Sequence, residues 1–366
     1  MRGADTKQAM MFSMLSPEKR VPSNHPLRAV KALADAALAE LSPVFSEMYS
    51  AVGRPSIPPE RLLKASLLMA LYTLRSERMF CEQLDYNLLF RWFLDMNMDE
   101  ESFVPTVFTK NRERLMKHDV ASKFFGTIVE QARKAGLMSD EHFTVDGTLI
   151  EAWASLKSFQ RKDQKPGDKP PPDDPGNPTV DFHGEKRSNE THESKTDPEA
   201  RLARKGKGKE AKLAYSQHAL MENRNGLLVE LQIAPANGTA ERETAIAMMD
   251  EHLPGDDRIT LAGDKGYDTR DFIAQCRERN VTPHVAQNIG PRRGSAIDGR
   301  TTRHAGYSVS QVIRKRVEEI FGWTKTVANF RKTRFRGLER TQLASYLVGA
   351  AYNLMRMGRL LAPTRP

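Results

Sequence analysis

The order of strand-like and helix-like segments in the C-terminal half of the chain constrains its fold most strongly. HFTVDGTLIEAWAS, which begins at His142, has the composition of a strand, and two further strand-like segments flank an Arg-Asn-Gly hairpin turn at 224–226. The segments that follow alternate in type: helix 240–253, strand 258–264, helix 269–280, strand 281–287 and a long helix 311–330. Three hairpin-linked strands followed by helix-separated strands predict a mixed sheet with helices on both faces.

This order is that of the ribonuclease H fold, so we expect an α/β domain whose mixed sheet is flanked by helices. The preceding residues show helical periodicity, and we expect an all-α N-terminal domain over 1–135, with DNA binding as one role for it, followed by the α/β domain over 136–355. Within the second domain, the text KPGDKPPPDDPGNPT has almost no apolar residue. We interpret about 157–205 as a disordered, Pro-rich insert.

Three acidic residues lie at positions that suit metal-dependent chemistry. Asp146 ends the apolar part of the first strand, Asp264 ends the fourth strand, and Glu318 lies on the last long helix. Phosphodiester chemistry on two Mg²⁺ ions needs a few carboxylates around ions about 4 Å apart, and Mg²⁺ prefers oxygen ligands. Each acid alone also has a simpler interpretation, because Asp before Gly is common in turns and Glu318 can pair with Arg314 at i, i+4.

Two cations share a helix face with Glu318. At 100° per residue, Arg314 and Lys325 both lie within about 40° of Glu318 around a continuous helix axis. A carboxylate with a cation on either side suits metal binding beside a phosphate strand. Val317, Ile320, Phe321 and Thr324 are expected to seat the same helix.

Basic residues with interleaved aromatics indicate a polyanionic partner. Residues 299–340 contain eleven basic and three acidic side chains, nearly the whole excess of a chain with a net charge of +9. This pattern favours nucleic acid, although an Arg-rich helix pair packed by its aromatics is also consistent with it. The candidates for DNA contact there are Arg314, Lys325, Trp323, Arg331, Lys332, Arg334 and Arg336.

A second basic segment follows Pro105. The short helix expected there carries Lys110 and Arg112, as the recognition helix of a helix-turn-helix would, but many surface helices have this composition.

Cysteine usage and apolar runs exclude several protein classes. The chain has only Cys81 and Cys276, which excludes a disulfide scaffold and a cysteine zinc cluster. The longest apolar run, 65–74, is too short to cross a bilayer, and the N-terminus has no apolar signal core. We therefore expect no membrane association and a cytoplasmic, nucleoid-associated location. His142, His218 and His284 are interpreted as packed or surface residues and not as metal ligands.

The chain resembles the DDE transposases of bacterial insertion sequences, in the group named for insertion sequence five. The resemblance rests on MFSMLSPEKRVPSNHPLR, the helical front through FTKNRERL, the DGT and GDKGYD motifs, and RKRVEEIFGWTK. It implies a ribonuclease H-like catalytic domain whose acids are Asp146, Asp264 and Glu318. The motif around the third acid contains a Tyr, an Arg, the Glu and a Lys. Gln311 replaces the Tyr here, and choosing Glu319 as the acid would match the Arg and Lys places less well.

The resemblance also implies a reaction and its partners. Such transposases cut the ends of their element and join the exposed 3′-hydroxyls to target DNA, with two Mg²⁺ ions or Mn²⁺ in their place. Asp146, Asp264 and Glu318 would hold the metals, and Arg314 and Lys325 would hold phosphates. Trp323 would either stack on a base or pack its helix. The expected partners are double-stranded element ends and target DNA, bound by a homo-oligomer.

The sequence is also consistent with two other functions. A ribonuclease H-like nuclease without strand transfer often carries an acid on the helix after the third strand, where Glu241 and Glu243 lie. The second is a DNA-binding regulator or relic without catalytic activity.

Overall fold

The computed structural model describes residues 16–50, 52–53, 55–163, 181–182, 185–206, 208–253, 257–290 and 294–362. Within these ranges, none of the helices combines the length and apolar character needed to cross a membrane.

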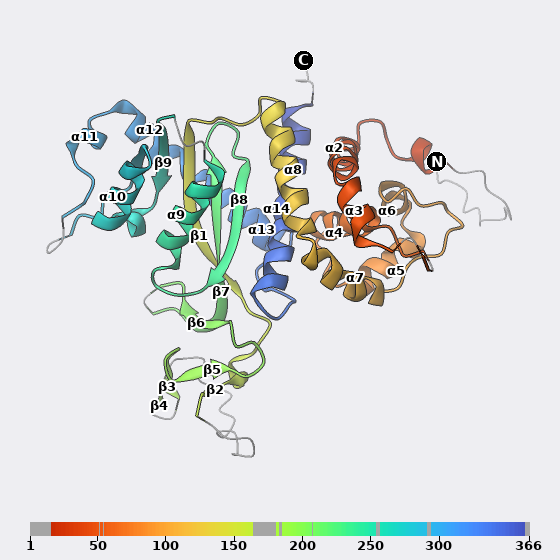
Figure 1. Ribbon diagram of the computed structural model, residues 1–366, viewed down its shortest axis with the longest axis horizontal. Helices are drawn as coiled ribbons and strands as arrows, with labels where there is room; N and C mark the ends of the chain where they lie inside the picture. The colour runs from red at the N-terminus through yellow and green to blue at the C-terminus, as the bar shows by residue number, and fades with distance from the viewer. Residues whose placement is uncertain are drawn as a thin grey trace, which may run out of the picture.

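A six-stranded mixed sheet forms the centre of the fold (Figure 1). Its strands are β1 (His142–Glu151), β6 (Arg201–Arg204), β7 (Ala211–Glu222), β8 (Leu228–Pro235), β9 (Ile259–Gly263) and β10 (Val281–Val285). β7 pairs antiparallel with β1, β6 and β8, whereas β9 runs parallel to both β1 and β10. The order β8-β7-β1-β9-β10 is that of the ribonuclease H fold, so this prediction from the sequence is confirmed.

The hairpin between β7 and β8 forms where the Arg-Asn-Gly turn predicts it. Gly226 has φ +69°, a left-handed conformation that suits a residue without Cβ. The buried Glu222 carboxylate accepts hydrogen bonds from the backbone N–H groups of Arg224, Asn225 and Leu227. The turn therefore satisfies its own polar groups and sets the register in which β7 pairs with β8.

Helices cover the sheet and form the N-terminal region. The N-terminal helices are α1 (Pro17–Arg20), α2 (Leu27–Glu40), α3 (Ser42–Met48), α4 (Pro59–Leu71), α5 (Glu77–Tyr86), α6 (Leu88–Phe93), α7 (Thr106–Lys117) and α8 (Val120–Lys134). The later helices are α9 (Ala240–His252), α10 (Arg270–Glu278), α11 (Gly299–Thr302), α12 (Ala305–Ile313), α13 (Arg316–Thr326) and α14 (Leu338–Leu360), with short 3₁₀ turns η1 (Leu156–Ser158) and η2 (Lys265–Tyr267).

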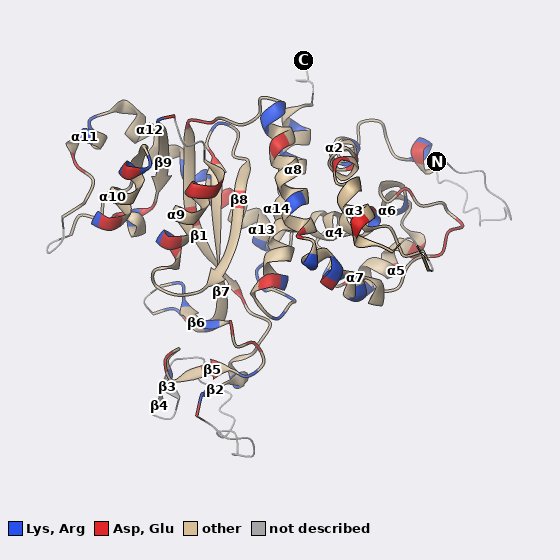
Figure 2. Cartoon of the chain, viewed as in Figure 1, with Lys and Arg blue, Asp and Glu red and all other residues tan. Residues whose placement is uncertain are grey.

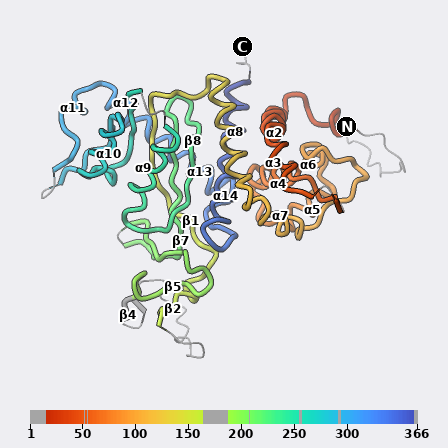
Figure 3. Tube along the Cα trace, in the orientation of Figure 1, coloured from red at the N-terminus to blue at the C-terminus, as the bar shows by residue number. Residues whose placement is uncertain are grey.

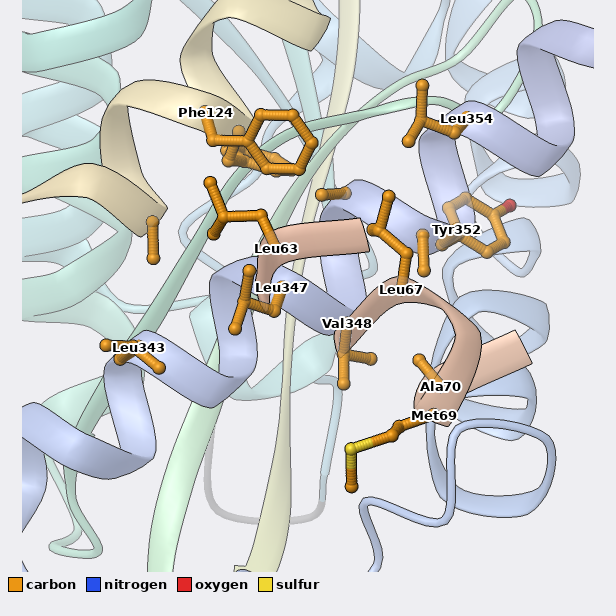
Figure 4. Packing of buried hydrophobic residues seen from close by; sticks show 14 of the residues in the cluster. Leu63, Leu67, Met69, Ala70, Phe124, Leu343, Leu347, Val348, Tyr352 and Leu354 are labelled. Atoms are coloured by element: carbon orange, nitrogen blue, oxygen red, sulfur yellow. The ribbon is translucent and has the colours of Figure 1, made fainter. Parts of the chain in front are cut away.

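The C-terminal helix α14 joins the N-terminal helices to the sheet. It contacts α2, α4 and α8 on one side and β8 on the other. Figure 4 shows Leu63 and Leu67 of α4 and Phe124 of α8 beside Leu347 and Val348 of α14. One hydrophobic core therefore spans both parts of the chain, and the domain limits at 135 and 136 stay a proposal about sequence organisation.

The long helix expected over 311–330 differs from the structure. It is divided into α12 and α13, because the hydrogen bonds at the join tighten from i−4 to i−3: Lys315 donates to Val312 and Glu318 donates to Lys315. Arg314 is the first residue of this join and does not belong to α13. The expected seat of the helix is confirmed, since α13 buries Val317, Ile320, Phe321 and Thr324.

Residues at both ends of the insert expected over about 157–205 form strands, so the expectation of disorder is wrong for these ends. β2 (Phe159–Arg161) pairs with β5 (His192–Ser194), β3 (Asp181–Phe182) pairs with β4 (Glu185–Lys186), and β6 joins the main sheet. Buried Phe159, Ser194 and Ala200 supply packing that the Pro-rich text lacks. That text, from 164 to 180, lies outside the described residues. Figure 3 shows β2 and β5 extending beyond the end of the main sheet.

Candidate active site

The sheet register brings Asp146 and Asp264 together. Thr144 of β1 lies beside Ala262 of the parallel strand β9, and each aspartate follows two residues later. Neighbouring strands are about 5 Å apart, so the two carboxylates emerge side by side. β1 continues to Glu151, which means that Asp146 lies within a strand. The simpler interpretation of Asp146 as a turn residue is therefore wrong.

The two aspartates form a cluster of like charge. The Asp146 carboxylate accepts a hydrogen bond of 2.7 Å from the N–H of Gly147, and Asp264 accepts one of 2.7 Å from Gly266 as the cap of η2. Burial raises the pKa of Asp146 to about 7, and repulsion from Asp264 and Glu241 adds to the shift, while the Gly147 bond and Arg314 oppose it. Without a bound cation, the site therefore destabilises the ionised form of the Asp146 carboxylate.

Glu241, in the first turn of α9, is the third acid beside this pair. A Cβ at Gly147 would lie 3.2 Å from both Cγ and Oε1 of Glu241, so the glycine leaves room for that side chain. Arg242 donates a 3.3 Å hydrogen bond to the carbonyl of Gly266, which ties the start of α9 to the loop after β9. Burial raises the pKa of Glu241 and repulsion from Asp264 adds to the shift. Red segments mark the acids of α9 beside the sheet in Figure 2.

Sequence reasoning named Glu241 only in connection with a rival function. A glycine inside a strand often marks a close approach, and Gly147 was the available signal. Glu243, two positions further along α9, is not among the residues that line the cavity described next.

The three acids line one cavity of about 540 Å³. Arg204 and Lys205, at the end of β6, line the same cavity and place positive charge opposite the carboxylates. Lys325 lies nearby and donates a 2.6 Å hydrogen bond to the Thr148 hydroxyl of β1. Burial lowers the pKa of Lys325 to about 8, with further lowering by Lys205 and Arg331. Carboxylates can bind a metal ion and nearby cations can bind a phosphate, so this cavity suits a phosphodiester next to a metal ion.

Glu318 is placed differently from the two aspartates. It lies exposed in the first turn of α13, and its carboxylate forms no hydrogen bond or ion pair with the described residues. Burial raises the pKa of Tyr352 on α14 and the charge of the neighbouring Glu319 adds to that shift, so Glu319 lies within reach of α14. The role of Glu318 as third acid stays a prediction.

The predicted DNA contacts divide into free and engaged side chains. Lys110, Arg331 and Arg336 are exposed, and the Lys332 ammonium lies 5.7 Å from the ring centre of Trp153. By contrast, three residues already have protein partners: Arg112 pairs with Glu77 and stacks on Phe335, Arg334 donates to the carbonyl of Arg75, and Trp323 packs on Tyr352. Arg314 donates a hydrogen bond to Gln311, and its charge partly opposes the rise in the pKa of Asp146 that burial causes.

The acids suit a divalent cation by their chemistry. Asp146, Asp264 and Glu241 form no ion pair with any described cation of the chain, and all supply carboxylate oxygens, the donors that Mg²⁺ prefers. In the described part of the chain no three or more His, Cys, Asp or Glu side chains lie close enough together to hold a metal ion. Mg²⁺ keeps several waters, so two carboxylates suffice to hold it.

A ribonuclease H sheet with one carboxylate within β1 and another directly after β9 is the arrangement expected of an enzyme that acts on phosphodiester bonds. Comparison with protein families agrees, because a transposase domain model matches residues 15–114 and a transposase DDE domain model matches residues 179–354. The chain belongs to the DDE transposases of insertion sequences, and it is a DNA transposase. Asp146 lies outside both matched ranges, so only the geometry connects it to Asp264. Enzymes of this family work with divalent metal ions.

The chain also has distant likenesses among solved structures. The piggyBac transposase synaptic complex with hairpin DNA is 11% identical with a TM-score of 0.37, over 93% of this chain and 82% of that one. The pre-cleavage Mos1 transpososome is 11% identical with a TM-score of 0.20, over 85% and 82%. The Mos1 mariner paired end complex with Mn is 12% identical with a TM-score of 0.19, over 89% and 84%.

Proposed function

We propose that this transposase cleaves the ends of its insertion sequence and joins the exposed 3′-hydroxyls to target DNA by in-line phosphoryl transfer. The observation that carries the proposal is the pairing of Asp146 and Asp264 on neighbouring parallel strands, in one cavity with cations opposite. Cleavage and joining are the same chemical step with different nucleophiles, so one site can serve both.

Asp146 and Asp264 hold two Mg²⁺ ions in this proposal, or Mn²⁺ in their place, and Glu318 completes the ligand set. Bound ions supply an activated attacking oxygen and a stabilised leaving oxygen. The chain itself orients the strand: Arg314 and Lys325 bind phosphates on either side of the carboxylates. Lys325 reaches the site through its hydrogen bond to Thr148, two residues beyond Asp146.

DNA binding beyond the cavity is assigned to the free cations. We propose that Arg331, Lys332 and Arg336, which follow α13, bind the duplex, and that Lys110 of α7 does so from the N-terminal helices. The contacts of Arg112, Arg334 and Trp323 support a packing role for these three residues instead. The proposed partners are double-stranded element ends and target DNA, bound by a homo-oligomer in the bacterial cytoplasm at the nucleoid. Membership of the group named for insertion sequence five is proposed on the motifs alone.

One assay separates the candidate reactions. Purified transposase is incubated with a labelled element end and a target plasmid, with Mg²⁺ or with a chelator. The proposal expects metal-dependent cutting and 3′-end joining. A nuclease without strand transfer, which the position of Glu241 favours, would cut without joining. A DNA-binding relic would bind DNA and do neither, with or without metal.

Replacing Arg331, Lys332 and Arg336 with Gln should weaken binding to every DNA sequence and flatten its salt dependence. Each lost phosphate contact lowers the slope of log K against log salt by about 0.9. Fluorescence anisotropy at several salt concentrations measures this slope. Arg112→Gln is the matched control, because its charge already pairs with Glu77. An unchanged slope in the triple variant would show that these cations face solvent in the complex.

A further inference from the structure

Two buried polar side chains beside the aspartates have no partner among the described residues. The hydroxyl of Tyr267 is buried, with the residue 1% exposed, and forms no hydrogen bond there. His218 is 0% exposed, and neither of its ring nitrogens has a hydrogen-bond partner there. Buried polar groups normally have hydrogen-bond partners. These two groups lie beside the acids without one, which indicates that a bound ligand or ion supplies the missing partner.

Both side chains lie close to Glu241. His218 of β7 is the cross-strand neighbour of Gly147, and its Nδ1 would lie 3.1 Å from a Cβ at that glycine, where Glu241 would also lie 3.2 Å away. Burial raises the pKa of Tyr267 well above its usual range, and the charges of Asp146, Glu241 and Asp264 add to the shift, so its hydroxyl lies within the field of all three carboxylates. The imidazole and the phenol therefore border the same cluster.

Glu241 and Asp264 lie on either side of Gly266. A Cβ at Gly266 would lie 2.9 Å from Oδ1 of Asp264 and 3.7 Å from Oε2 of Glu241. The glycines at 147 and 266 therefore leave room for the Glu241 side chain beside both aspartates. None of the three carboxylates forms an ion pair with a described cation, so a bound cation would relieve their mutual repulsion.

We propose that Glu241 is a further metal-binding carboxylate of this site, supplied by α9 together with Asp146 and Asp264 before Glu318 joins from α13. This inference rests on the proposed two-metal function and adds a ligand that the family motifs do not contain. Tyr267 is then a positioning residue, whose hydroxyl donates a hydrogen bond to a carboxylate that holds the ion. Outer hydrogen bonds of this kind orient metal ligands.

Mn²⁺ binding to the full chain without DNA tests the proposal. Electron paramagnetic resonance of free Mn²⁺ gives the affinity for the wild type, Glu241→Gln and the matched control Glu243→Gln on the same helix. We expect Glu241→Gln to weaken Mn²⁺ binding by about tenfold or more and Glu243→Gln to leave it within about twofold. Wild-type affinity in Glu241→Gln overturns the proposal.

A second variant keeps every carboxylate and displaces Glu241 together with the neighbouring His218 ring. Gly147→Ala adds a Cβ 3.2 Å from that side chain, and we expect it to weaken Mn²⁺ binding severalfold. Thermal melting in chelator checks folding: Glu241→Gln should melt at or above the wild-type temperature, because one repelling charge is gone. Added Mn²⁺ should raise the melting temperature of Glu241→Gln by less than it raises that of the wild type. An equal rise in melting temperature in wild type and variant contradicts the proposal.

Asp264→Asn separates this inference from the proposed function. Loss of Mn²⁺ binding in Asp264→Asn with normal binding in Glu241→Gln would refute the role of Glu241 alone. Normal Mn²⁺ binding in Asp264→Asn would refute the metal site itself.

Discussion

Asp264→Asn and Asp146→Asn should each abolish DNA cutting and 3′-end joining. We expect losses of about three orders of magnitude or more, equivalent to about 4 kcal/mol of transition-state stabilisation, because a neutral amide cannot replace a carboxylate between two cations. Single-turnover assays on a labelled element end measure the loss. Full cleavage by Asp264→Asn would remove the proposed mechanism.

Folding stability provides the control for the Asp146→Asn variant. The pKa of Asp146 is raised to about 7 in the folded chain, above the ordinary value of 3.8, so the folded state binds the proton more tightly than the unfolded state. Stability therefore falls as pH rises from about 4 to about 7, and the ionised group destabilises the fold above that range. In chelator at pH 8, Asp146→Asn should be at least as stable as the wild type in urea. A clear loss of stability would point to a structural role.

Glu318→Gln should lose nearly all strand-transfer activity, whereas Glu319→Gln should keep most of it. Adjacent helix positions differ by about 100°, so only one of the two side chains can turn towards the aspartates. Burial raises the pKa of Tyr352 on α14, and the charge of Glu319 adds to that shift. Glu319 is exposed, and an exposed charge contributes only about 0–1 kcal/mol even when it is paired. The same 3′-end joining assay, run on both variants in parallel, measures the difference.

The reverse result would have a definite meaning. Activity in Glu318→Gln and none in Glu319→Gln would shift the assignment by one residue and remove the roles of Arg314 and Lys325 with it. Glu318 is exposed and forms no hydrogen bond with either aspartate in this structure, so we expect it to join the metal ligands only when DNA is bound. Glu318→Gln should therefore bind Mn²⁺ normally without DNA and fail only in the complex.

Local patterns in the sequence were sufficient for the strand order and for two of the acids. Hairpin turns, strand alternation and helix-separated strands specify which strands are neighbours, because these preferences act over a few residues. Once β1 and β9 are neighbours, Asp146 and Asp264 must meet, since each follows the paired residues by two positions. The net charge of residues 299–340 is likewise independent of the fold.

Side-chain proximity across elements was decided only by the tertiary structure. Glu241 reaches the aspartates because α9 packs over β1 at a glycine, and nothing in its own sequence neighbourhood records that distance. Arg112 and Arg334 have the composition of DNA contacts, yet the packing of the N-terminal helices against the loop after α13 engages both. The division of 311–330 into α12 and α13 also depends on what each half packs against, because helix periodicity alone does not register a single tightened turn. The sequence by itself determined which acids the β1 and β9 strands bring together, because strand order and register follow from local patterns, and the tertiary structure decided which further side chains share their cavity.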